Sequence, residues 1–230
     1  MFWNDDKDKQ PGFAIPDDVV DLAYRIGCPT IPLDHAHSLS SALLKALPWL
    51  ADEETAGVHL IHGAASGNGW FRPEDTENEL LHLSKRTRMR LRVPKNRLQD
   101  AQALSGQTLD IEGHPLEIGK SEVFMLSSLP TLFSRYVITR AELDETQFLE
   151  DVARELKTID IPYRKMLGGI THTMNFPDGQ VFTRSLMVAD LEPEQSVRLQ
   201  QLGLGEGRTI GCGLFLPHKG IAPVKGPDDE

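Results

Sequence analysis

Two histidines separated by one residue, His35 and His37, open a segment with helical periodicity, DHAHSLSSALLKAL. If Asp34 caps this helix, both histidines lie in its first turn, where free backbone N–H groups and the positive end of the helix dipole attract phosphate. A histidine there has a lowered pKa and exchanges protons near neutral pH. A cap at Ser38 would instead leave both in the preceding loop, and surface or capping histidines without a chemical role fit the spacing equally well. The segment is therefore a candidate site for proton transfer beside a phosphate.

A second candidate is a basic strand. The stretch KRTRMRLRVPKNR, residues 85–97, holds seven basic residues and no acidic one, in a chain of formal net charge −10. Side chains at alternate positions of a strand share a face and lie about 7 Å apart, and four like charges in such a row repel unless an anion offsets them. Guanidinium groups bind phosphate in a bidentate manner, so the row predicts binding of a polyanion such as nucleic acid, with a solvent-exposed strand face as the alternative. The residues concerned are Lys85, Arg86, Arg88, Arg90 and Arg92.

The third candidate is a glycine-rich loop with a basic residue at its centre. It contains Gly203, Gly205, Gly207, Arg208, Gly211 and Gly213. Gly203 is explained as the end of a helix, but so many glycines indicate a backbone that closely approaches another element or a phosphate. A tight connection between a helix and a strand is the structural alternative. The spacing does not fit a dinucleotide-binding fingerprint, because Arg208 stands where the third glycine would be.

The histidines also allow a metal site to be considered. His35 and His37 form one pair and His59 and His62 another, but no HExxH motif and no pair of cysteines accompanies them. We therefore expect neither a metal nor another cofactor. A metal-dependent hydrolase that uses these four histidines is kept as an alternative.

The elements that must position these residues follow a repeated pattern. In the first half, periodicity and turn signals predict strands at 19–27, 57–64 and 83–94, one or two short strands at 108–119 around a turn at Gly113, and helices at 38–47 and 96–104. The second half repeats the order, with strands at 134–139, 170–176, 181–188 and 209–217 and helices at 146–157 and 192–203. Two βαββαβ units predict an α+β protein with two tandem ferredoxin-like (RRM-like) domains, 17–133 and 134–222, and acidic flexible tails at 1–16 and 223–230.

The composition is that of a globular protein, with 40% hydrophobic and 25% charged residues in 230. The longest apolar runs are too short for a membrane helix, no secretory signal is visible, and two cysteines form no framework. These features predict a cytoplasmic protein with no membrane partner. Without the seven basic residues at 85–97 the chain would carry −17, so its positive charge is concentrated and nucleic acid is an expected partner.

The glycine-rich loop, GLGEGRTIGCGLF, resembles the C-terminal signature of the CRISPR-associated repeat-RNA endoribonucleases, family six of the RAMP superfamily. Further segments are similar to that family. DHAHSLSSAL looks like its segment after the first strand, LSKRTRMRLRVP like its basic strand, LFSRYVIT like the join into its second half and LFLPHKGI like the terminal segment of a short subtype. The resemblance covers roughly residues 17–222, nearly the entire chain.

The resemblance implies two ferredoxin-like domains and metal-independent cleavage of CRISPR repeat RNA (precursor crRNA) into guide RNAs. The 2′-hydroxyl of the RNA attacks the adjacent phosphate and leaves a 2′,3′-cyclic phosphate and a 5′-hydroxyl. The catalytic histidine of the family falls on the DHAH segment, where we expect His35 rather than His37. The expected RNA contacts are the basic strand, the glycine-rich loop and Lys219. Because some members bind the repeat without cutting well, a non-catalytic RNA-binding subunit of a CRISPR effector complex is the alternative, and other subunits of such a complex are further expected partners.

Overall fold

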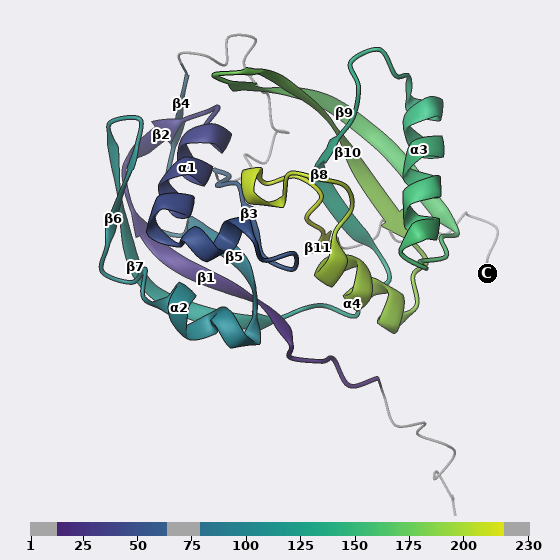
Figure 1. The fold of residues 1–230 in the computed structure, drawn as a ribbon, viewed down its shortest axis with the longest axis horizontal. Helices are drawn as coiled ribbons and strands as arrows, with labels where there is room; N and C mark the ends of the chain where they lie inside the picture. The colour runs from purple at the N-terminus through teal and green to yellow at the C-terminus, as the bar shows by residue number, and fades with distance from the viewer. Residues whose placement is uncertain (1–12, 64–78, 219–230) are drawn as a thin grey trace, which may run out of the picture.

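The chain forms two α+β units (Figure 1), and the computed structural model describes residues 13–63 and 79–218. The first unit contains β1 (Val19–Gly27), β2 (Thr30–Pro32), α1 (Ala36–Ala46), β3 (Gly57–His59), β4 (Leu80–His82), β5 (Arg88–Pro94), α2 (Leu98–Gln102), β6 (Thr108–Ile111) and β7 (His114–Met125). The second contains β8 (Leu132–Ile138), α3 (Glu145–Thr158), β9 (Lys165–Phe176), β10 (Gly179–Ala189), α4 (Pro193–Leu202) and β11 (Leu216–Pro217). Short 3-10 helices occur at η1 (Pro48–Ala51), η2 (Lys95–Arg97) and η3 (Arg208–Ile210).

Both units have the strand order of a ferredoxin-like fold. The main sheet of the first unit has the order β3-β5-β1-β7-β6, and the sheet of the second has the order β11-β8-β10-β9. In each unit the first strand of the βαββαβ pattern lies between the third and the fourth, so the predicted fold class is confirmed. The separate antiparallel ribbon of β2 and β4 was not predicted. None of the helices in the described part is long and apolar enough to cross a membrane.

The period-two pattern of β1 explains the core of the first unit. Leu22 and Tyr24 are fully buried, and Leu91 of the neighbouring β5 is buried with them. Leu39 of α1 packs against the same face, and α1 lies in front of the sheet in Figure 1. The Tyr24 hydroxyl donates a hydrogen bond of 2.6 Å to the carbonyl of Ala101 in α2. Because these residues seal one face, the alternate residues, including the arginines of β5, point to the opposite face.

The second unit is built around α3. Asp144 caps this helix in a capping box with Gln147, and each side chain accepts a hydrogen bond from the other residue's backbone N–H. Phe148, Val152 and Leu156 follow at helical spacing and form the buried stripe that packs on the sheet. The α3 prediction, residues 146–157, is confirmed to within one residue at each end.

The strands predicted at 57–64 and 83–94 span only Gly57–His59 and Arg88–Pro94, and three further boundaries need correction. The predicted strand 209–217 is wrong, because only Leu216–Pro217 pairs with β8 and Gly211 and Gly213 have φ of +88° and +66°, outside the strand region. The boundary drawn at residue 133 falls inside β8. Phe13 and Ile15 pack in a small apolar cluster between the units, so this part of the predicted tail is held by contacts. The rest of the two predicted tails, apart from Ala14 and Pro16, lies outside the described residues.

Candidate functional site

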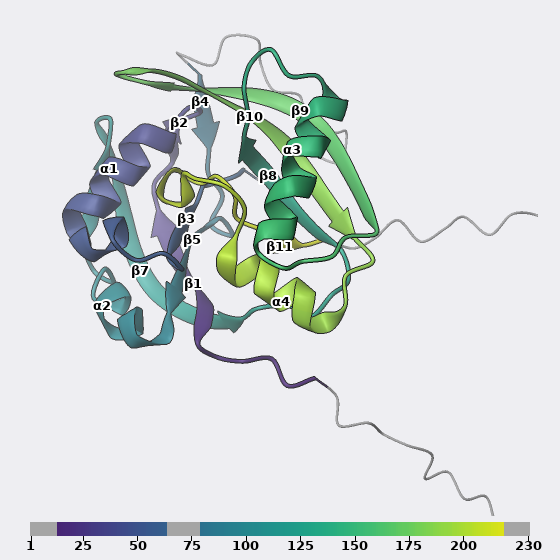
Figure 2. The same cartoon turned by 45° about the vertical axis from the view of Figure 1, so that its right-hand side comes forward.

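The glycine-rich loop lies between the two units. Figures 1 and 2 both place its yellow trace between α1 of the first unit and β8 of the second. The Gly213 N–H donates a hydrogen bond of 2.7 Å to the carbonyl of Tyr136 in β8. A Cβ atom added at Gly211 would lie 2.5 Å from Cγ of Leu60, and one added at Gly213 would lie 2.0 Å from the carbonyl oxygen of Leu204. The close approach that the glycines indicated is, at these two positions, an approach to the protein itself. Gly203 is also buried, Gly207 is half-buried, and Gly205 is exposed.

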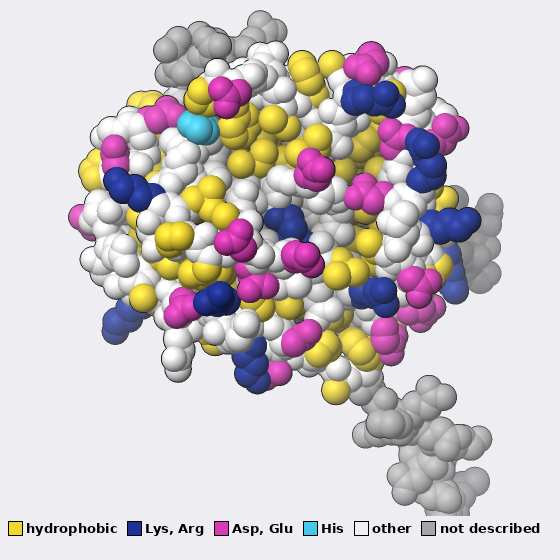
Figure 3. Space-filling model, viewed as in Figure 1, with side chains coloured by type: hydrophobic (Ala, Val, Ile, Leu, Met, Phe, Trp, Pro, Cys, Tyr) yellow, Lys and Arg dark blue, Asp and Glu magenta, His cyan; other side chains and the backbone are white. Residues whose placement is uncertain are grey.

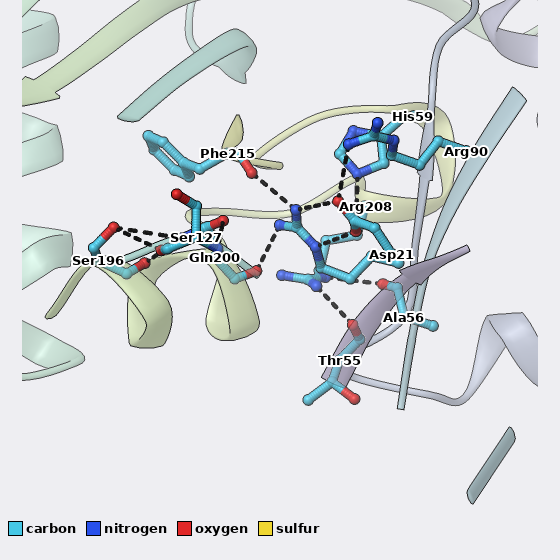
Figure 4. Close-up of polar contacts among 11 residues, drawn as sticks. Asp21, Thr55, Ala56, His59, Arg90, Ser127, Ser196, Gln200, Arg208 and Phe215 are labelled. Atoms are coloured by element: carbon cyan, nitrogen blue, oxygen red, sulfur yellow. Dashed lines mark hydrogen bonds and ion pairs between the residues drawn. The ribbon is translucent and has the colours of Figure 1, made fainter. Parts of the chain in front are cut away.

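Beside this loop, a buried ion pair of the first unit is hydrogen-bonded to the second unit (Figure 4). Arg92 of β5 is fully buried, and its Nε and Nη2 atoms donate to the Asp21 carboxylate of β1 at 2.9 and 3.2 Å. The same guanidinium donates to the carbonyl of Gln200 at 2.7 Å and to that of Phe215 at 2.9 Å, both in the second unit. Burial alone would raise the pKa of Asp21, but the positive charge of Arg92 and the nearby ring of His59 hold that pKa well below its usual value.

Arg208 makes a second connection across the interface. Its Nε atom donates to the carbonyl of Ala56 at 2.9 Å, and its Nη2 atom donates to that of Thr55 at 2.8 Å. Burial, together with the nearby charge of Arg92, lowers the pKa of Arg208 to about 10, so the side chain stays charged near neutral pH. The central basic residue of the glycine-rich loop thus binds backbone carbonyls of the first unit.

The interface between the units buries part of the row of four arginines and leaves the rest exposed. Arg86 and Arg88 are exposed, as is Lys85, whereas Arg90 is half-buried and Arg92 has no exposed surface. The predicted RNA contact by Arg92 does not fit this burial, because its guanidinium has no exposed surface and donates to Asp21 and to the carbonyls of Gln200 and Phe215. On the face shown in Figure 3, acidic and basic side chains are interspersed, so that face carries no broad basic surface. Lys219 lies outside the described residues.

His35 holds two segments of the first unit together. It is the N-cap residue of α1 and is 3% exposed. Its Nδ1 atom lies 3.0 and 3.1 Å from the carbonyl oxygens of Pro32 and Leu33, and its Nε2 atom accepts a hydrogen bond of 3.0 Å from the N–H of Ile61. These partners assign the proton to Nδ1, and burial lowers the pKa of His35, although the bonds to the two carbonyls oppose the shift. Both ring nitrogens are therefore engaged by the backbone.

His37, unlike His35, is not held by hydrogen bonds to the backbone in the part of the chain that the structure describes. It is half-buried in the first turn of α1, and neither ring nitrogen has a hydrogen-bond partner among the described residues. Its ring packs edge-on against Phe176 of β9, with ring centroids 5.6 Å apart.

Asp34 does not cap α1 and instead accepts two hydrogen bonds of 2.9 Å from Asn175, which tie the start of the helix to β9. Ser38, the other predicted cap, lies inside α1 and donates to the carbonyl of His35.

Sequence reasoning missed a group of rings at the same interface. Tyr136 of β8 lies between His62 and His172, with ring centroids 6.0 and 5.3 Å away. His62 and Tyr136 line a cavity of about 20 Å³ together with His35. Burial and the charge of Arg135 lower the pKa of His62 to about 3, so this histidine is neutral near pH 7. The residues come from distant segments that meet only when the units dock, and no short motif in the sequence marks them.

The alternative metal site is not assembled from the four histidines. Within residues 13–63 and 79–218, no group of three or more His, Cys, Asp or Glu side chains is arranged to hold a metal ion. His59 instead faces Asp21, with its Nε2 atom 3.7 Å from a carboxylate oxygen, and burial lowers the pKa of His59.

Comparison with known proteins agrees with this architecture. The family model Cas6, described as Cas6 Crispr, matches residues 20–220. A relative from Myxococcus xanthus (strain DK1622), named CRISPR-associated endonuclease Cas6, is 32% identical over 206 residues, which cover 90% of this chain and 84% of the relative. Two solved structures share the fold. One, called CRISPR associated protein Cas6, has a TM-score of 0.56 at 11% identity and covers 87% of this chain and 100% of its own. The other, described as an RAMP protein binding different RNA substrates, has a TM-score of 0.59 at 13% identity and covers 86% and 98%. With a family match that spans both units and a relative similar over nearly its full length, the resemblance seen in the sequence is confirmed and the chain belongs to the Cas6 family.

Proposed function

We propose that this protein is an endoribonuclease that cleaves CRISPR repeat RNA into guide RNAs, without a metal ion and by attack of the RNA's own 2′-hydroxyl. The observation that carries the proposal is the match to the Cas6 family over residues 20–220, together with a relative that is named an endonuclease. The proposal includes a cytoplasmic location, where two cysteines that form no disulfide stay reduced.

We assign the proton transfer to His37 rather than to His35. A proton acceptor for the 2′-hydroxyl needs a free ring nitrogen, and His37 has one while both nitrogens of His35 bond to the backbone. The start of α1, where His37 lies, has no side-chain cap, and its positive dipole end favours the charge that develops on the phosphorane. His35 then acts as a positioning residue, because it fixes the start of α1 against Ile61.

The remaining predicted RNA contacts stay part of the proposal. Lys85, Arg86, Arg88 and Arg90 keep solvent-accessible side chains on and beside β5, and Gly205 is the exposed member of the glycine-rich loop. A phosphate backbone bound by these residues would give strongly salt-dependent binding.

The test is cleavage of end-labelled repeat RNA in excess EDTA, beside copies with a 2′-deoxy substitution at each candidate position. We expect one cut that survives EDTA and stops at one deoxy position. His37→Ala should lower the cleavage rate by about 10²- to 10⁴-fold and keep repeat affinity. His114→Ala, at the first residue of β7, is the matched control and should cleave normally.

Three results would contradict parts of the proposal. Loss of cleavage in EDTA would refute the metal-independent reaction. Full activity in His37→Ala would refute the assignment of proton transfer. Tight repeat binding with no cleavage by the unmodified protein would favour the non-catalytic subunit of an effector complex.

A further inference from the structure

A hollow of about 430 Å³ opens on the face of the first sheet that the helices leave uncovered. Its floor is Ala23 of β1, which lies opposite Arg90 of β5 on one side and opposite Glu122 of β7 on the other. Because the Ala23 side chain is a single methyl group, the longer side chains beside it form walls rather than a filled surface. The volume lies in the range of about 300 to 1,000 Å³ that is typical of small-ligand pockets.

The charges around this hollow are unbalanced. Arg25 of β1 and Arg88 of β5 are direct cross-strand partners, and like charges in that position destabilise a sheet unless an anion lies between them. Lys120 of β7 adds a third exposed positive charge. Within the described residues, neither Arg25 nor Lys120 has an ion-pair partner, and Arg88 donates only to the carbonyls of Lys85 and Thr87. These three side chains suit a phosphate group.

One wall of the hollow is aromatic. Phe124 of β7 is 41% exposed, and the guanidinium of Arg90 lies 5.6 Å from the centre of its ring. Nucleobases stack on aromatic rings and on arginine planes, and such stacking tolerates any base. A site that binds phosphate alone needs no exposed aromatic ring. The aromatic wall therefore indicates that a base enters the hollow as well as a phosphate.

Glu122 adds a group that a phosphate would repel. Its carboxylate lines the hollow opposite Ala23, among three basic side chains and Arg90. A carboxylate accepts hydrogen bonds from the amino group of a base, as glutamate does with the N4 amino group of cytosine. Uracil has no amino group to donate.

We propose that this hollow binds one unstacked nucleotide of single-stranded RNA whose base carries an amino group. Its phosphate lies between Arg25 and Arg88, its base packs on Phe124 and Arg90, and its amino group donates to Glu122. The inference rests on the proposed function, because it takes RNA as the substrate. It adds a subsite that distinguishes bases and lies apart from the proton-transfer site at His37.

The test is fluorescence anisotropy with short labelled RNAs, one of cytidines and one of uridines, over a salt series. The cytidine RNA should bind more tightly. Phe124→Ala should weaken the binding of both RNAs by about fivefold or more. Arg88→Ala should lower the slope of log affinity against log salt by about 0.7. Glu122→Gln should reduce the preference for cytidine by about fivefold.

Matched controls come from the second unit. Tyr163 is 42% exposed, nearly the same as Phe124, and Arg154 is an exposed arginine on α3. Tyr163→Ala and Arg154→Ala should leave affinity and salt slope unchanged. Far-UV circular dichroism checks that each variant is folded, which we expect because Phe124, Arg88 and Glu122 are exposed.

Two sets of results would overturn the inference. Unchanged affinity in Phe124→Ala together with an unchanged salt slope in Arg88→Ala would remove the nucleotide site. Equal affinity for the two RNAs would refute the recognition of the base. If either occurs while the unmodified protein still cleaves repeat RNA, the inference fails and the proposed function stands. A protein that neither binds nor cleaves repeat RNA would refute both.

Discussion

Replacing Arg92 by alanine should uncouple the two units. The change removes a guanidinium that bonds to Asp21 and to the carbonyls of Gln200 and Phe215. The Asp21 carboxylate, only 4% exposed, would keep Arg90 and His59 as its remaining charged or polar neighbours. Removing one partner of a buried ion pair typically costs about 3 to 5 kcal/mol. Each carbonyl that loses its donor adds a further cost of about 1 kcal/mol or more, unless water enters. We therefore expect the free energy of unfolding to fall by at least about 3 kcal/mol.

The measurement is urea unfolding followed by circular dichroism. Arg92→Ala should lower the midpoint and split the transition, because the units would then unfold independently. Arg88→Ala, on the same strand but exposed, should change the free energy of unfolding by no more than about 0.5 kcal/mol. A double variant, Asp21→Leu with Arg92→Met, should recover part of the lost stability, since apolar residues of similar volume often replace a buried ion pair without loss.

The opposite result would support the role that the sequence assigned to Arg92. If Arg92→Ala unfolds like the unmodified protein but binds repeat RNA more weakly, with a salt slope lower by about 0.7 to 0.9, the side chain contacts phosphate. The interface described around Asp21 would then be refuted.

Three further predictions concern residues whose surroundings are equally specific. Gly211→Ala should lower the free energy of unfolding by about 2 to 4 kcal/mol, because the new methyl group would meet a leucine side chain 2.5 Å away at a φ of +88°. Gly106 also has a positive φ, +91°, but open space surrounds it. In paired urea titrations, Gly106→Ala should therefore lower the free energy of unfolding by only about 1 to 2 kcal/mol. His35→Ala should lower the free energy of unfolding by about 2 to 4 kcal/mol, because it leaves the Ile61 N–H without a partner. Cleavage per folded molecule, measured well below the melting temperature, should fall less than in the His37 variant. Burial lowers the pKa of His35 and, to about 3, that of His62, so below pH 6.5 the unfolded chain binds more protons than the folded one. Stability should therefore fall as pH drops from about 6.5 to 4, by up to about 1.4 kcal/mol per pH unit for each histidine, in urea titrations at a series of pH values.

Elements whose local pattern agrees with their burial could be predicted well from the sequence. β1 begins and ends where its alternation predicts, and α4 starts at Pro193 and ends before Gly203 as its terminal residues indicate. The strand prediction for 209–217 was wrong because the apolar residues of this segment follow a pattern typical of a strand. Its glycines take left-handed conformations that the packing between the units requires, and periodicity carries no information on that packing.

The candidate site was predictable only in part, for a related reason. Period two correctly puts the arginines of β5 on one face, but it cannot reveal that the second unit covers Arg92 and leaves Arg88 exposed. The spacing of His35 and His37 says nothing about Ile61, whose N–H occupies one of the ring nitrogens from 26 residues away. Tyr136 could be recognised as part of a strand, but its position between two histidine rings depends on the docking of the units.

The bonds of Arg92 also set an order of events during synthesis. Its carbonyl partners in the second unit, Gln200 and Phe215, follow it by 108 and 123 residues. At about 5 to 20 residues per second, the ribosome delivers them roughly 5 to 25 s after Arg92. Until then the ion pair between Arg92 and Asp21 is open to water on a nascent first unit, and the glycine-rich loop that will close over it has not been made. The second unit therefore shields this ion pair of the first unit from water. A ribosome that stalls before α4 holds an incomplete chain whose first unit exposes a charged, hydrated face.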